Sequence, residues 1–79
     1  MNKEEFLTIV DKEIDRLNKE IVETENLIAF YENMKDPRLE REKRKLYVLR
    51  QQVKKLVEIT LLYRQVWDFF HTVVIMDSA

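Results

Sequence analysis

The chain has 79 residues, a formal net charge of −1, 37% charged and 46% hydrophobic residues, and no cysteine. A core of this size supplies only about 3–5 kcal/mol of stability, and without cysteine there are no disulfides or thiolate metal sites to add to it. The composition excludes a disordered chain, and the near-neutral charge excludes the strongly basic balance of a typical nucleic-acid binder. We therefore expect one domain, residues 1–79, that oligomerises.

The first segment, about residues 3–34, places apolar side chains at the two core positions of a seven-residue repeat. This spacing is typical of a helix that buries one stripe in a coiled coil. The repeat positions are, in chain order, Leu7, Val10, Ile14, Leu17, Ile21, Thr24, Ile28 and Tyr31. The pattern predicts one long helix with a single polar exception in its core.

The chain contains no glycine and one proline, so the segment around that proline, about residues 33–38, is the clear candidate for a turn. Asp36 can cap the next helix with its carboxylate, and Pro37 suits the first helical position because its missing N–H is not needed there. Glu40 and Glu42 would then lie at the positive end of the helix dipole. We predict that a second helix follows directly.

The second segment, about residues 37–76, carries the same seven-residue repeat. Its repeat positions are Leu39, Leu46, Leu49, Val53, Leu56, Thr60, Tyr63, Trp67, Phe70 and Val74. A turn this short makes two such helices fold back on each other. The sequence therefore predicts an all-α fold, an antiparallel two-helix coiled-coil hairpin. Its predicted core is Leu7, Val10, Ile14, Leu17, Ile21, Ile28, Tyr31, Leu46, Leu49, Val53 and Leu56.

Opposite charges on the two halves favour the same hairpin. Residues 1–36 hold ten acidic and five basic residues, a net −5, whereas residues 37–79 hold five acidic and nine basic residues, a net +4. With the turn near Asp36, antiparallel pairing brings together positions whose numbers sum to about 71. This register predicts that a group of acids lies near a group of bases: Glu20, Glu23 and Glu25 near Arg44, Lys45 and Arg50.

The second helix is the longer one, so residues from about 67 to 79 project beyond the start of the first helix. They belong to the most apolar stretch, since twelve of the eighteen residues 59–76 are apolar. An exposed apolar patch of this extent marks a protein interface, and we expect a dimer that forms a four-helix bundle. The predicted interface residues are Leu62, Tyr63, Val66, Trp67, Phe69, Phe70, Val73, Val74 and Met76.

A membrane span over residues 59–76 is disfavoured because Arg64, Asp68 and His71 interrupt it. Each costs about 2.5–3.5 kcal/mol at the bilayer centre when charged. Residues 1–5, MNKEE, lack the cationic start and apolar run of a signal peptide. We expect a cytoplasmic protein without a membrane span.

Nucleic-acid binding would rest on the bases of residues 38–45, RLEREKRK. Interspersed glutamates and the acidic first helix explain these bases as a solvated, salt-bridged surface, and no base-stacking aromatic residues accompany them. We expect a protein partner instead.

A metal site would rest on Asp68 and His71, whose i, i+3 spacing is similar to that of ligands in di-iron helical bundles. Both lie outside the repeat positions, and those bundles use glutamate in this motif. The chain also has no cysteine nucleophile and no glycine-rich phosphate loop. We expect no buried acid or base at the core positions of the repeat, which form the seam between the helices. We expect no metal, no cofactor and no enzymatic activity.

Two functions remain. The first is a non-enzymatic protein–protein interaction module, a homo-oligomeric hairpin that acts as an adaptor or structural component. The second is a small regulator or inhibitor, of the kind encoded by phages and mobile elements, that docks its apolar C-terminal helix on a larger enzyme or nucleic-acid machine. In both, residues 7–63 serve as scaffold and residues 67–76 carry the function. An alternative fold has the β-branched run 72–75 breaking the helix or forming a short extended segment.

Overall fold

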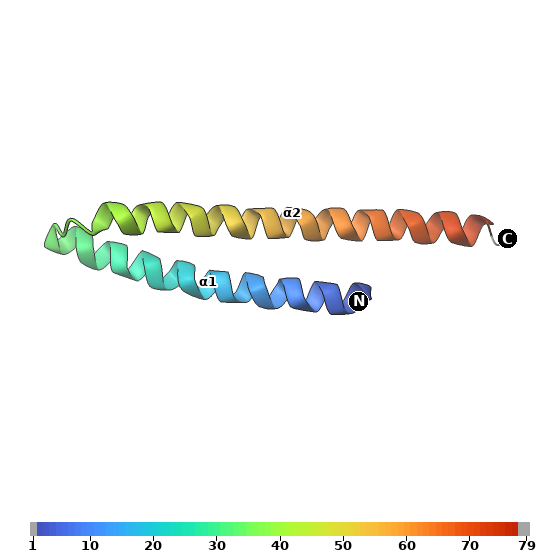
Figure 1. The fold of residues 1–79 in the computed structure, drawn as a ribbon, viewed down its shortest axis with the longest axis horizontal. Helices are drawn as coiled ribbons and strands as arrows, with labels where there is room; N and C mark the ends of the chain where they lie inside the picture. The colour runs from blue at the N-terminus through green and yellow to red at the C-terminus, as the bar shows by residue number, and fades with distance from the viewer. Residues whose placement is uncertain (1, 78–79) are drawn as a thin grey trace.

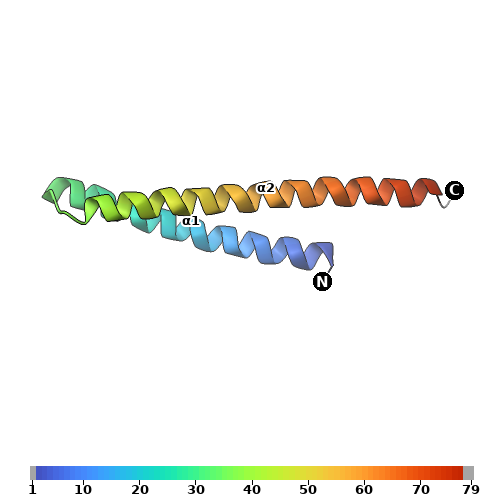
Figure 2. The same ribbon diagram turned by 45° about the horizontal axis from the view of Figure 1, so that its top comes forward.

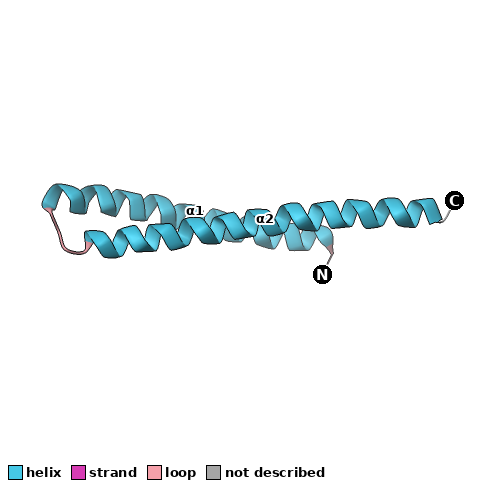
Figure 3. Cartoon of the chain, turned by 90° about the horizontal axis from the view of Figure 1, so that it is seen from above, coloured by secondary structure: helices cyan, strands magenta, loops and turns pink. Residues whose placement is uncertain are grey.

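The chain forms a hairpin of two long helices (Figure 1). The structure is a computed structural model that describes the backbone of residues 2–77 and the side chains of residues 2–69. Helix α1 spans Lys3–Met34 and α2 spans Leu39–Asp77. The helices run antiparallel and cross at a shallow angle (Figures 1 and 3), in a molecule 68 Å long and only 16 by 14 Å across. The predicted all-α hairpin is confirmed.

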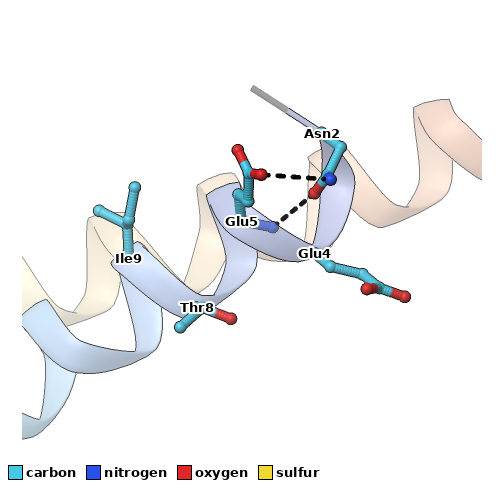
Figure 4. A pocket seen from close by; sticks show the side chains of 5 residues that line it. All are labelled: Asn2, Glu4, Glu5, Thr8 and Ile9. Carbon is cyan, nitrogen blue, oxygen red and sulfur yellow. Dashed lines mark hydrogen bonds between the residues drawn. The ribbon is translucent and has the colours of Figure 1, made fainter.

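Helix α1 begins at a capping residue, Asn2. Its side-chain oxygen accepts a hydrogen bond from the backbone N–H of Glu5 at 2.8 Å, and its amide nitrogen donates to the Glu5 carboxylate at 3.4 Å (Figure 4). The first bond satisfies one of the N–H groups that have no partner in the first turn of a helix. Glu4 and Glu5 also place negative charge at the positive end of the dipole.

Helix α1 ends in a left-handed residue, Lys35, with φ 52° and ψ 41°. The N–H of Lys35 donates to the carbonyl of Glu32 at 3.3 Å, and the N–H of Asp36 donates to that of Tyr31 at 3.0 Å. These two bonds satisfy carbonyls at the helix end in the pattern of a Schellman motif. Glycine usually occupies this position, because a residue with a Cβ loses about 1–2 kcal/mol there.

The start of α2 differs from the prediction by two residues. The Asp36 carboxylate accepts the backbone N–H of Arg38 at 2.9 Å and pairs with the Arg38 guanidinium at 2.8 Å. However, the N–H of Leu39 bonds to the carbonyl of Asp36 at 3.1 Å, an i to i+3 bond that tightens this turn. The regular helix therefore begins at Leu39, and Pro37 lies in the preceding turn.

The carboxylate of Asp36, in the turn before α2, makes the fold sensitive to acid. Hydrogen bonds from the side chain and backbone of Arg38 lower the pKa of Asp36 from 3.8 to about 2. Its stabilising contribution is therefore present above the unfolded value and is lost as the pH falls through the folded value. We expect acid to lower the thermal unfolding midpoint more for the native chain than for Asp36→Asn, measured by circular dichroism. Asparagine keeps an acceptor for the Arg38 N–H, and an equal acid response in both chains would contradict this role.

The repeat positions face the partner helix. Every repeat position identified from the sequence within residues 2–69 is buried or half-buried. The buried ones are Val10, Leu17, Thr24, Tyr31, Leu49 and Thr60. The hydroxyl of Thr24 donates to the carbonyl of Glu20 at 2.7 Å, and that of Thr60 to the carbonyl of Leu56 at 2.9 Å. Both buried threonines therefore satisfy their hydroxyls within their own helix.

Contacts between the helices follow the predicted register. At the open end, opposite the turn, Lys3 pairs with Asp68 at 3.5 Å, and nearer the turn Arg50 pairs with Glu25 at 3.2 Å. The other residues of the two predicted groups make no ion pair between the helices within residues 2–69. Glu20 pairs within α1 instead, and Glu23, Arg44 and Lys45 form no ion pair with any residue that the structure describes.

Two seam positions were not recognised in the sequence, Lys3 at the open end and Glu42 near the turn, and both side chains are half-buried. Glu42 occupies the repeat position between Leu39 and Leu46. Its Oε2 atom is buried without a hydrogen-bond partner. The expectation that no buried acid or base lies in the seam is therefore wrong for Glu42.

Helix α2 continues beyond the start of α1 as far as Asp77 (Figures 1 and 2). Residues 72–75 are therefore helical, and the alternative of a break or an extended segment there is not adopted. Within residues 2–77, neither helix has a stretch both long and apolar enough to cross a membrane, as predicted.

Candidate interaction surface

An aromatic cluster closes the seam at the open end. The rings of Phe6 and Tyr63 lie 4.4 Å apart, and those of Tyr63 and Trp67 lie 6.2 Å apart. The Lys3 ammonium lies 5.8 Å from the centre of the Trp67 ring, within range of a cation–π interaction. Tyr63 and Trp67, which the sequence assigned to an intermolecular interface, are thus half-buried against α1.

A stripe of exposed apolar side chains lies beside this cluster on α2. It consists of Ile59, Leu62, Val66 and Phe69, with exposed fractions of 49%, 59%, 64% and 72%. Their spacing of three and four residues puts them in one row along the helix. We call this row the α2 stripe. It adjoins the buried seam, and α1 leaves it uncovered.

A second exposed stripe lies near the turn, on α1. Leu27, Phe30 and Met34 have the same spacing and are 39%, 55% and 62% exposed. We call this row the α1 stripe. This region was expected to serve only as scaffold, because that expectation rested on the seam positions. The signal in the sequence that marks the α1 stripe is a second row of apolar residues, spaced by three and four, beside the seam.

Both stripes belong to one face of the hairpin. A shallow depression between the helices, half-way along, is lined by Glu13 and Arg16 of α1 and by Gln52 and Lys55 of α2. Steps of three and four residues connect Arg16 to the α1 stripe, and the same steps connect Lys55 to the α2 stripe. Each of these rows has the same average spacing as the seam, which stays buried along the described part of the hairpin. Each row therefore stays on one side of the seam from end to end.

We call this surface the shared face. In α1 its row is Ile9, Glu13, Arg16, Glu20, Glu23, Leu27, Phe30 and Met34. In α2 its row is Arg41, Lys45, Val48, Gln52, Lys55, Ile59, Leu62, Val66 and Phe69. The shared face is therefore apolar on α1 near the turn and on α2 near the open end, with charged groups in the middle and bases on α2 beside the α1 stripe.

The charged middle of the shared face is organised by Arg16. Its guanidinium pairs with Glu20 at 2.7 Å and makes two hydrogen bonds to Glu13. These hydrogen bonds lower the pKa of the Glu13 carboxyl and raise that of Arg16. Lys55, on the opposite side of the depression, forms no ion pair within the described part of the chain. The middle therefore presents a net acidic group of Glu13, Arg16 and Glu20 on α1 and a lysine on α2.

The structure places the predicted interface and core residues differently. Of the predicted interface residues, Leu62, Val66 and Phe69 are exposed on the α2 stripe. The predicted side chains of Phe70, Val73, Val74 and Met76 lie outside the described residues. Of the predicted hairpin core, four residues are buried: Val10, Leu17, Tyr31 and Leu49. The remaining seven are half-buried: Leu7, Ile14, Ile21, Ile28, Leu46, Val53 and Leu56.

Other hollows offer little chemistry. One is lined by Asn2, Glu4, Glu5, Thr8 and Ile9, all from the first turns of α1 (Figure 4). The Glu4 carboxylate points away from that of Glu5 in this view, so the two acids do not converge on a common point. No group of three or more metal-ligating side chains gathers among the described residues.

The shared face thus combines apolar and charged rows from both helices in the described part of the molecule. Such rows, at helical spacing, are the form in which a helix presents itself to another helix. Comparisons with protein-family models, with curated proteins and with solved structures find no match to this chain.

Proposed function

We propose that this chain is a non-enzymatic protein–protein interaction module, a helical hairpin that self-associates and acts as an adaptor or structural component. The observation that carries the proposal is that more large apolar side chains are exposed than are buried. Within residues 2–69, four apolar side chains are buried, whereas thirteen large apolar side chains are exposed. A small monomer seldom exposes contiguous apolar rows of this kind unless they contact another protein.

The dimensions of the molecule support the same proposal. A hairpin 16 by 14 Å across consists of one pair of helices side by side. Each helix is therefore covered by only one neighbour. Two hairpins packed together would form a four-helix bundle, in which each helix has two neighbours and the exposed rows are buried. Self-association thus compensates for the small core.

Self-association is tested by light scattering of the purified chain over a wide range of concentrations. We expect a dimer that dissociates on dilution while its helical circular dichroism signal weakens, because stability and assembly are linked. A helical monomer at every concentration would contradict the proposal.

A second candidate is a small regulator that docks the C-terminal part of α2 on a larger enzyme or nucleic-acid machine. The observation favouring it is the overhang of α2, which runs from about Phe69 to Asp77 with no part of α1 beside it (Figure 1). A chain lacking the last ten residues separates the two functions. If the truncated chain still dimerises but loses a partner that the full chain captures, the overhang is a docking segment. If it becomes monomeric or aggregates, the overhang belongs to the oligomer.

A further inference from the structure

We propose that two copies of this chain dimerise through the shared face with their turns at the same end, around a two-fold axis that runs along the hairpin. This inference rests on the proposed self-association and adds the surface and the orientation. A two-fold interface uses the same patch on both copies, so the patch must be large enough and must match itself.

The shared face is large enough. Its two-helix part is as long as α1, whose 32 residues span about 48 Å at about 1.5 Å per residue. With a molecular width of 16 Å this part offers about 770 Å² per protomer, close to the roughly 800 Å² per partner of a standard specific interface. The α1 stripe at one end and the α2 stripe at the other place hydrophobic area on both sides of a charged middle. Contact along the whole face would therefore bury both stripes at once.

The charges of the two helices select the orientation. When the turns lie at the same end, α1 of each copy lies over α2 of the other copy. The half that contains α1 carries −5 and the half that contains α2 carries +4, so unlike helices meet. In the reverse orientation, with turns at opposite ends, α1 would lie over α1 and α2 over α2. Charge complementarity fixes orientation in this way because like-charge contacts are costly.

The charged middle favours the same orientation. Glu13 and Lys55 line one depression, so they lie at the same height along the hairpin. In the proposed dimer the Glu13–Arg16–Glu20 group of each copy faces Lys55 of the other, and this contact occurs twice. Lys55 is free for this role, since it forms no ion pair among the described residues.

The overhang also distinguishes the two orientations. Lys3 lies opposite Asp68, so α2 has no helix of its own chain beside it after that point. With the turns at the same end, the two overhangs lie side by side. In the reverse orientation each would project past the turn of the other copy. Phe69, which is 72% exposed, stands where the two copies of α2 would first meet.

The surface is tested by charge reversal with a matched neighbour. Lys55→Glu places an acid opposite the partner's acidic group, whereas Lys54→Glu makes the same change one position away, outside the shared face. We expect Lys55→Glu to raise the dissociation constant of the dimer about tenfold or more, measured by analytical ultracentrifugation, and Lys54→Glu to change it little. Equal effects would overturn the assignment of this face.

The orientation is tested by disulfide cross-linking, which is simple because the chain has no cysteine. We expect Phe69→Cys to form a covalent dimer under mild oxidation, after sedimentation under reducing conditions has shown that the variant still dimerises. Cross-linking only when Phe69→Cys is mixed with Met34→Cys, a variant at the turn end, would overturn the orientation. A native chain that never dimerises would instead refute the proposed function itself.

Discussion

Replacement of Leu17 by alanine is expected to leave most of the chain unfolded at room temperature. Leu17 is 3% exposed, the lowest value among the buried apolar side chains of residues 2–69. Truncating a leucine in such a site costs about 2–5 kcal/mol, because the transfer of its methyl groups is lost and a cavity remains. That cost is comparable to the entire stability of a core of this size. Urea denaturation followed by circular dichroism, at one fixed protein concentration, measures the loss.

The matched control is Leu61→Ala. Leu61 is 53% exposed, lies on α2 and belongs neither to the seam nor to the shared face. It should lose well under 1 kcal/mol, since surface substitutions away from special features rarely cost more. A loss at Leu17 no larger than that at Leu61 would show that the seam is not the main source of stability.

Replacement of Glu42 by leucine is expected to stabilise the chain by about 1–2 kcal/mol. The substitution removes a buried carboxylate oxygen that has no hydrogen-bond partner and adds apolar area at a seam position. It also removes a negative charge from the first turn of α2, where such a charge contributes about 0.3–1 kcal/mol. The first effect is larger, so the midpoint of thermal unfolding should rise.

Glu40→Leu separates these two effects. Glu40 lies in the same first turn, but its side chain is 74% exposed, so the variant loses the interaction with the dipole without gaining a seam contact. We expect Glu40→Leu to lower the midpoint slightly while Glu42→Leu raises it. If Glu42→Leu also lowers the midpoint, the Glu42 carboxylate stabilises the native chain, and its burial without a partner is not a net cost.

The fold could be predicted closely because its signals are local and repeated. The seven-residue spacing of residues such as Leu17 and Leu49 identifies helices and the stripe that each buries, and both residues are buried in the structure. The chain has no glycine and one proline, so the sequence contains only one clear candidate for a turn. Opposite net charges and the short turn then indicated antiparallel pairing, and the Lys3–Asp68 contact has the expected register.

The details at the turn could not be predicted because they depend on three-dimensional geometry. Lys35 adopts the left-handed conformation that favours glycine, and no sequence signal marks a lysine for that position. The half-buried position of Glu42 follows from the seven-residue repeat. It was not predicted, because a charged residue within the charged segment 38–45 does not look like a core position. The sequence placed Glu20 near the bases of the second helix but did not show that its ion pair is with Arg16, one helical turn away on the same helix.

The sequence by itself determined the two helices, the turn and the buried seam, since each depends on the period of one segment. Only the tertiary structure decided which rows on the two helices join into one surface. That outcome depends on how α1 and α2 are rotated toward each other, and the depression lined by Glu13 and Lys55 establishes it. Antiparallel packing sets two separate apolar stripes on the same side of the hairpin. The candidate interaction surface is therefore a whole face of the molecule, and not only the uncovered end of α2.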